Sequence, residues 1–184
     1  MKGKWGFAAA VLSIAASSGF AAGETVMVGG QAMLPSKDIV DNAVNSADHT
    51  TLVAAVKAAG LVDTLKSPGP FTVFAPTNEA FAALPAGTVD TLVEPENKAT
   101  LTSILTYHVL PGRYDFSKLD SAIKAGGGKA SIKTVNGEML TFTENGPRNI
   151  VVADAAGHTA DISTYDVYQS NGVIMVVDKV LMPK

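Results

Sequence analysis

The hydrophobic period of this chain changes at the triple glycine of residues 126–128. Before it, apolar residues mostly recur at helical spacing, as Leu101, Ile104 and Leu105 do. After it come short runs that are typical of strands because they are rich in Val, Ile, Thr and aromatic residues: ASIKTV, GEMLTFTE, NIVVADA, HTADISTYDVY and GVIMVVDKVLM. Helices that precede strands, instead of alternating with them, predict an α+β fold with mostly antiparallel strands.

Capping signals divide the first part of the chain into helices. Ser36, Asp48 and Thr77 are predicted N-caps, because their side chains accept hydrogen bonds from the free amides of a first helical turn. Gly60 suits the left-handed conformation that ends a helix. The predicted helices follow Ser36, run from Asp48 to Gly60, run from Thr77 to Pro85, start again at Pro95 and end before Leu110, and occupy 116–125.

Three further signals concern strands. The run 71–74 is β-branched and aromatic and predicts a short strand before the Thr77 helix. Asn136 and Gly137 predict a hairpin turn. The segment 173–177 is apolar on both faces, so it predicts a central strand that is covered on both sides.

The first residues have the pattern of a secretory signal peptide. Lys2 and Lys4 precede an apolar stretch at 5–14 that is too short for a permanent anchor, and small residues follow it. No later segment has the roughly 18 uninterrupted apolar residues of a membrane helix. We therefore expect a secreted or periplasmic protein without a permanent membrane anchor. The chain divides into a signal peptide (1–22), a flexible lead-in (23–35) and a single domain (36–184).

Composition excludes several classes of function. The chain has no cysteine, which excludes disulfides, thiolate catalysis and cysteine-ligated metals. Without Lys2 and Lys4 it has 12 basic residues (14 minus 2) against 17 acidic ones, a net charge of −5. Phosphate binding needs clustered positive charge, and the basic residues form no dense run, so nucleic acid is not an expected partner.

No catalytic or metal-binding constellation is visible. His49, His108 and His158 lie far apart in sequence and none belongs to a metal-ligand pair such as HExxH. No GxSxG motif is present, and AGGGKAS departs from a phosphate-binding loop because Ala130 follows the lysine and a strand comes next. We expect no enzyme activity, no metal and no cofactor.

Two stretches, GPFTVFAPTNEAFAALP at 69–85 and NGVIMVVDKVLMP at 171–183, are separated by LTYHVLPG. Their order and spacing resemble the fasciclin domain family, and the likeness extends from Asp38 to Pro183, including the helix TLVAAVKAAGLVDTLK. The resemblance implies a wedge of mostly antiparallel β-strands packed with a layer of short helices. It also implies a secreted or surface-attached protein used for adhesion and recognition.

The resemblance points to four partner-binding residues. Tyr107 and His108 match a tyrosine–histidine pair that is linked to integrin contact in animal members of the family. Asp166 and Val167 occupy the position of the family's aspartate–isoleucine step, although the surrounding residues do not reproduce the animal motif. In the last strand, Met175 stands where the family usually has a histidine.

The residues themselves leave different roles open. His108 is either a recognition contact or general base, or a buried imidazole that bonds to backbone and braces the chain reversal; its place on the apolar stripe of Leu101, Ile104 and Leu105 favours the brace. Tyr107 lies about 100° around the helix, where an exposed amphipathic contact is expected. Asp166 is equally consistent with a ligand contact and with a turn acid.

We therefore expect one of two functions, and we place the more strongly supported one first. The first is an exported, non-enzymatic adhesion or recognition module that binds a protein or glycan surface. The alternative is a carrier of an apolar small molecule such as a carotenoid or lipid, which certain algal fasciclin-type proteins bind. The many Ala, Val, Leu and Met residues of this chain would suit the lining of an adaptable groove.

Overall fold

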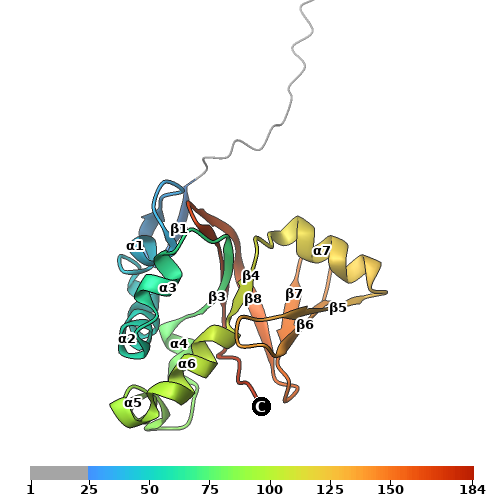
Figure 1. Ribbon diagram of the computed structural model, residues 1–184. Helices are drawn as coiled ribbons and strands as arrows, with labels where there is room; N and C mark the ends of the chain where they lie inside the picture. The colour runs from blue at the N-terminus through green and yellow to red at the C-terminus, as the bar shows by residue number, and fades with distance from the viewer. Residues whose placement is uncertain (1–24) are drawn as a thin grey trace, which may run out of the picture.

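A computed structural model describes residues 25–184 of the chain (Figure 1). Its main feature is a seven-stranded sheet with the order β4-β3-β9-β8-β7-β6-β5. The strands of this sheet are β3 (Phe71–Pro76), β4 (Val109–Pro111), β5 (Lys129–Lys133), β6 (Met139–Glu144), β7 (Ile150–Ala153), β8 (Thr159–Gln169) and β9 (Gly172–Val177). A separate hairpin is formed by β1 (Val26–Val28) and β2 (Gln31–Met33).

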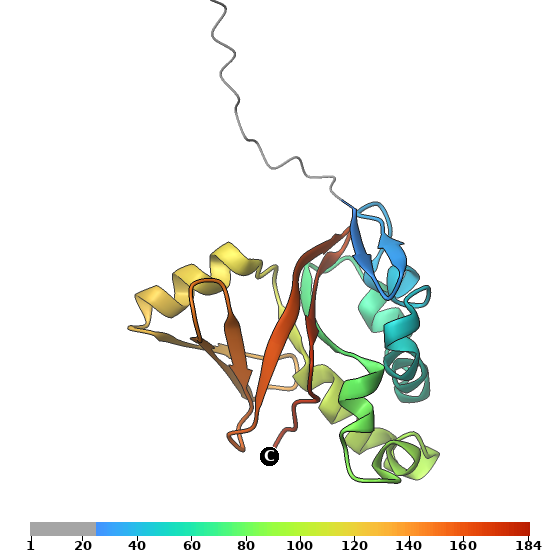
Figure 2. The same ribbon diagram turned by 180° about the vertical axis from the view of Figure 1, so that it is seen from behind.

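Short helices cover this sheet. The α-helices are α1 (Ile39–Ala43), α2 (Thr50–Ala59), α3 (Val62–Lys66), α4 (Asn78–Ala82), α5 (Thr88–Leu92), α6 (Lys98–Tyr107) and α7 (Phe116–Ala125). Two 3₁₀ turns, η1 (Ala47–His49) and η2 (Pro95–Asn97), precede α2 and α6. Figures 1 and 2 show α1, α2 and α3 on one side of β3, and α7 beside β5 and β6 on the other side.

The centre of the sheet is a parallel pair. Strands β3 and β9 run parallel, from Phe71 opposite Gly172 to Pro76 opposite Val177, whereas the other neighbouring strands pair antiparallel. Every residue of β9 is buried. Three predictions are confirmed: the α+β fold, the strand at 71–74, and the central strand at 173–177 that is covered on both sides.

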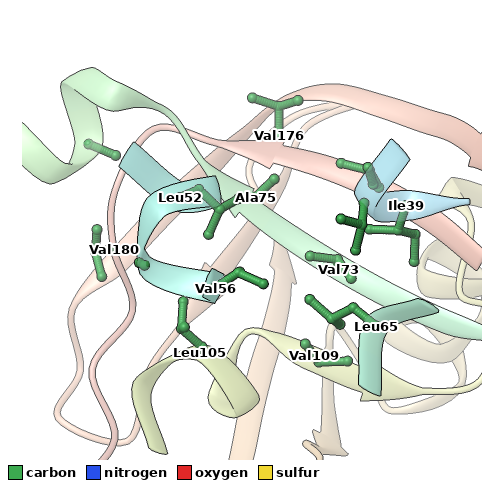
Figure 3. Packing of buried hydrophobic residues seen from close by; sticks show 14 of the residues in the cluster. Ile39, Leu52, Val56, Leu65, Val73, Ala75, Leu105, Val109, Val176 and Val180 are labelled. Atoms are coloured by element: carbon green, nitrogen blue, oxygen red, sulfur yellow. The ribbon is translucent and has the colours of Figure 1, made fainter. Parts of the chain in front are cut away.

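The alternation of side chains along β3 and β9 supplies two cores. Val73, Ala75, Ile174 and Val176 face the helical layer, in a first cluster that also contains Leu52, Val56 and Leu105 (Figure 3). Phe74, Val173, Met175 and Val177 belong to a second cluster with residues of α7, β6 and β7. Successive side chains of a strand point to opposite faces, so the two central strands are shared by both cores.

Several predicted boundaries are confirmed. Thr77 caps α4 by accepting a hydrogen bond from the Ala80 amide, and Gly60 ends α2 with a φ of 72°. Asn136 and Gly137 lie in the turn between β5 and β6, and α7 occupies the predicted range 116–125.

Other boundaries differ from the predictions. Asp38, rather than Ser36, caps α1 by accepting from the Asp41 amide. Asp48 lies inside a 3₁₀ turn and does not cap α2. The helix α5 was not predicted, because five residues are too few for a helical period to be readable.

The flexible lead-in predicted for 23–35 is wrong at 26–33, where β1 and β2 pair. Val28 and Met33 are buried in the first cluster, so order begins before Ser36. The predicted signal peptide lies outside the described residues. Within 25–184, no helix combines the length and the apolar character needed to cross a membrane.

Candidate functional site: the α6 end and the adjoining surface

Tyr107, the last residue of α6, is fully buried in the second cluster. Its hydroxyl donates to the Met139 carbonyl at 3.1 Å and accepts from the Ala155 amide at 2.9 Å. Burial raises the pKa of this phenol, so it stays protonated and keeps its role as donor. The expectation of an exposed Tyr107 contact is wrong, because the ring lies in the core and its hydroxyl fastens the first residue of β6 and the turn after β7.

His108 follows α6 and is also buried, but it lies on the side that faces the first cluster. Its Nδ1 lies 2.8 Å from the Ile104 carbonyl, and its Nε2 accepts from the Leu181 amide at 2.9 Å. Because Nε2 accepts, Nδ1 carries the proton and the imidazole is neutral. Burial lowers its pKa to about 4. The interpretation of His108 as a buried brace at the chain reversal is confirmed.

The C-terminal segment is fastened at a second point. The Asp154 carboxylate accepts from the Met182 amide at 3.2 Å and from the His158 amide at 2.8 Å. Burial raises the pKa of Asp154, but the hydrogen bonds from Met182 and His158 outweigh burial and keep the pKa below its ordinary value. His108 and Asp154 therefore hold consecutive amides, those of Leu181 and Met182.

Asp166 and Val167 lie in the irregular middle of β8. Val167 is buried in the first cluster. Asp166 is half-buried, has a φ of 56°, and accepts from the Phe116 amide at 2.7 Å. Burial raises the pKa of Asp166; the Phe116 hydrogen bond and the Arg148 charge oppose this, and the Asp115 charge adds to it.

The four predicted partner-binding residues do not form one hydrogen-bonded site, although His108 and Val167 line a common cavity. No hydrogen bond among the described residues joins Tyr107 or His108 to Asp166 or Val167. Three of the four are buried, so any effect of these three on binding is transmitted through the fold. Their partner-binding role stays a prediction, and Asp166 alone of the four reaches the surface.

Beside Asp166 lies a surface that sequence reasoning missed, here called the arginine–tyrosine face. It consists of Arg113, Tyr114, Phe116, Lys118, Arg148 and Tyr168. Its cations lie over its rings: Arg113 at 6.0 Å from the ring centre of Tyr168, Lys118 at 4.3 Å from that of Tyr114, and Arg148 at 5.5 Å from that of Phe116. One sequence signal was available, because Arg113 and Arg148 are the only arginines in the chain.

A second feature is a cavity of about 70 Å³ between the helical layer and the sheet. Its walls are mainly apolar and come from α2, β3, α6 and β9, and include Val56, Val73, Leu105 and Ile174. His49 and His108 also line it. Within residues 25–184 no three His, Cys, Asp or Glu side chains are grouped as metal ligands would be.

The chain belongs to the fasciclin domain family, whose model matches residues 47–183. Its fold resembles that of a FAS1 domain pair from the insect cell adhesion molecule fasciclin I. The TM-score is 0.70 at 18% sequence identity, over 81% of this chain and 52% of that one. At this identity the likeness concerns the fold.

Three bacterial proteins show the similarity in sequence. Protein sll1483 of Synechocystis sp. is 42% identical over 96% of this chain and 97% of its own length. The immunogenic protein MPB70 of Mycobacterium bovis is 38% identical over 77% of this chain and 66% of its own. The cell surface glycolipoprotein MPB83 of the same species is 34% identical over 84% of this chain and 64% of its own.

Proposed function

We propose that this protein is an exported, non-enzymatic adhesion or recognition module that binds a protein or glycan partner at the cell surface or in the periplasm. Membership of the fasciclin family supports this proposal, as does a relative named as a cell surface glycolipoprotein. The observation that carries the proposal is the exposed arginine–tyrosine face, because Arg and Tyr are the residue types that most often anchor binding interfaces.

The Tyr107 and His108 side chains do not belong to the binding surface. Both side chains use their polar atoms on backbone groups inside the protein. Asp166 is partly exposed and bonds to the first residue of α7, which belongs to the arginine–tyrosine face. The adhesive surface is therefore expected around the start of α7 and the middle of β8 (Figure 1).

A cell-binding measurement tests this function. Beads carrying the purified protein are mixed with intact cells of the producing organism, and free protein is added as competitor. We expect saturable retention of cells that free protein abolishes, and pretreating the cells with protease or with glycosidases then separates a protein partner from a glycan. Retention no greater than on beads coated with albumin, in both growth medium and buffer, would contradict an adhesive role.

The cavity favours a second candidate function, the carrier of an apolar small molecule. At about 70 Å³ it is smaller than the roughly 300–1,000 Å³ of typical ligand pockets, so a carotenoid or lipid would enter only if α2 and α6 moved away from the sheet. Extraction of natively purified protein, followed by visible absorption and mass spectrometry, tests this. A stoichiometric pigment or lipid favours the carrier, and its absence from protein purified without detergent counts against it.

A further inference from the structure

We propose that the arginine–tyrosine face is a docking site for an acidic protein segment, with the Arg113 and Arg148 guanidinium groups binding carboxylates of the partner. This inference rests on the proposed function and specifies the chemistry of its partner. Every other basic position in residues 25–184 is a lysine or a histidine, whereas both arginines of the chain lie on this one face.

The face is assembled from three separate parts of the sequence. Arg113 to Lys118 form the loop before α7 and its first turn, Arg148 lies in the turn between β6 and β7, and Tyr168 lies in β8. The Asp166 carboxylate joins the first and third parts by accepting from the Phe116 amide. Figures 1 and 2 both show the start of α7 close to β8.

The rings beneath the cations are held in place before any partner arrives. Phe116 packs edge to face against Tyr165, with ring centres 5.3 Å apart. The Tyr165 hydroxyl accepts from the Ile150 amide at 2.7 Å, which fixes Tyr165 to β7. The Tyr168 hydroxyl lies 3.4 Å from the Asp115 carboxylate. Ordered rings reduce the entropy that binding would otherwise cost.

The two guanidinium groups keep donors free for a partner. Within residues 25–184, neither Arg113 nor Arg148 forms an ion pair, and both are exposed. Among these residues the Arg113 guanidinium forms one hydrogen bond, a long contact of 3.4 Å to the Gln169 carbonyl. A guanidinium presents five N–H donors in a fork that matches a carboxylate. Most of these donors therefore remain available to an acceptor from a partner.

The charges on the face indicate that this acceptor is negatively charged. Three exposed cations, Arg113, Lys118 and Arg148, lie on the face. Three acids lie nearby. Asp115 and Asp166 are half-exposed and engaged internally, since Asp115 accepts from the Lys118 amide at 2.9 Å and Asp166 accepts from the Phe116 amide. The exposed Asp161 accepts from the Asn149 side chain at 3.2 Å. The start of α7 adds the partial positive charge of a helix N-terminus. In a chain of net charge −3, this face attracts a negatively charged partner.

The arrangement of rings and cations favours a protein over a sugar. A cation lies over each of the rings of Tyr114, Phe116 and Tyr168, which leaves less ring surface for stacking on a neutral sugar. The groups that the face presents to solvent are guanidinium and ammonium groups beside aromatic rings. Tyr and Arg together are enriched at the energetic centres of protein interfaces. Aspartate or glutamate side chains beside an apolar residue are the complement.

Fluorescence anisotropy with a labelled peptide of alternating glutamate and serine, and its glutamine counterpart, tests the proposal on the purified protein. We expect the glutamate peptide to bind, with an affinity that falls as salt rises, and the glutamine peptide not to bind. The double variant Arg113→Gln, Arg148→Gln is expected to lose about tenfold or more in affinity. The variant Lys98→Gln, Lys179→Gln removes the same charge from exposed positions elsewhere and should bind like the wild type.

Amide NMR spectra of the folded proteins then locate the site. Glutamate peptide should shift the resonances of Arg113, Phe116 and Tyr168 in the wild type, and leave them unshifted in the arginine double variant. Equal peptide affinity in both double variants would overturn the proposal. So would binding of polygalacturonate or phosphatidylglycerol vesicles in preference to the peptide, because the face would then recognise an anionic glycan or lipid.

The two proposals fail separately. If beads carrying the arginine double variant still retain cells as the wild type does, adhesion stands and this face is not its site. If the wild type binds the acidic peptide but retains no cells, the docking site stands and the adhesive function fails.

Discussion

Two neighbouring residues at the end of α6 fasten different parts of the molecule. Tyr107 and His108 are consecutive, so their side chains leave the chain in directions about 100° apart. Tyr107 reaches Met139 at the start of β6 and Ala155 in the turn after β7, whereas His108 reaches the C-terminal segment at Leu181. Because each polar atom is already bonded, substitutions at either position act first on stability.

The buried His108 makes stability depend on pH. Its pKa is about 4 in the folded protein and 6.5 in the unfolded chain, so the unfolded state binds the extra proton first as pH falls. Above pH 6.5 the neutral imidazole contributes roughly 3 kcal/mol to the free energy of unfolding. This contribution is lost progressively as the pH falls to about 4. Urea unfolding across this range measures it.

His108→Gln isolates that contribution. We expect the variant to be less stable than the wild type at neutral pH, with the difference shrinking as pH falls toward 4. Part of the pH dependence should survive in the variant, because burial also lowers the pKa of His49. A stability difference that stays constant with pH would show that the imidazole is not buried neutral.

Tyr107→Phe removes one hydroxyl and leaves the Met139 carbonyl and the Ala155 amide without their partner. We expect a loss of about 1–3 kcal/mol in the free energy of unfolding, measured by urea denaturation. Tyr168→Phe is the matched control; its hydroxyl is exposed, so the change should stay within about 0.5 kcal/mol. Equal effects at the two positions would contradict the buried role of Tyr107.

At the scale of elements, the turn between β8 and β9 holds the helical layer to the sheet. The Asn171 amide group donates to the Leu65 carbonyl at 2.7 Å and to the Ser67 carbonyl at 3.0 Å, and its oxygen accepts from the Ile39 amide at 3.1 Å. One side chain therefore joins α1 and the end of α3 to the start of β9. Gly172 follows because a Cβ there would lie 2.2 Å from the Phe71 carbonyl oxygen.

Asn171→Ala should destabilise the protein by about 3 kcal/mol, because it leaves buried backbone groups of Ile39 and Leu65 unpaired. Chemical denaturation measures the loss. The exposed Asn145 offers a control, since Asn145→Ala should change stability by less than about 0.5 kcal/mol. A neutral Asn171→Ala would mean that the helical layer is held by its apolar contacts alone.

At the scale of the whole molecule, β3 and β9 join the two clusters into one folding unit. Met175 and Val176 are adjacent in β9 but face the second and the first cluster, respectively. Neither cluster keeps its shape without these strands. The structure therefore favours a single cooperative unfolding transition over independent melting of the helical side and the α7 side.

Truncations on the two faces of β9 test that cooperativity. Met175→Ala and Val176→Ala should each lower one shared transition, by about 2–4 kcal/mol for the longer methionine and less for valine. Hydrogen exchange followed by mass spectrometry should show α2 and β6 losing protection together in both variants. If Met175→Ala released β6 while α2 stayed protected, the two cores would be independent.

Local sequence patterns determined the elements and much of their order. The helical period at Leu101, Ile104 and Leu105, the Thr77 cap and the change of period after residues 126–128 are carried by neighbouring residues, so they were readable without a structure. The motifs at 69–85 and 171–183 indicated the family. Short elements such as α5 and the β1–β2 hairpin were missed because too few residues carry their pattern.

The tertiary structure alone decided the site. Whether Tyr107 points outward or inward depends on the backbone groups of Met139 and Ala155, which are far from it in sequence. The arginine–tyrosine face exists because the sheet order places β8 beside β7 and sets the start of α7 against β8 and the turn that precedes β7. Periodicity is a property of neighbouring residues, whereas a binding surface is formed by distant ones, and only the folded chain brings those together.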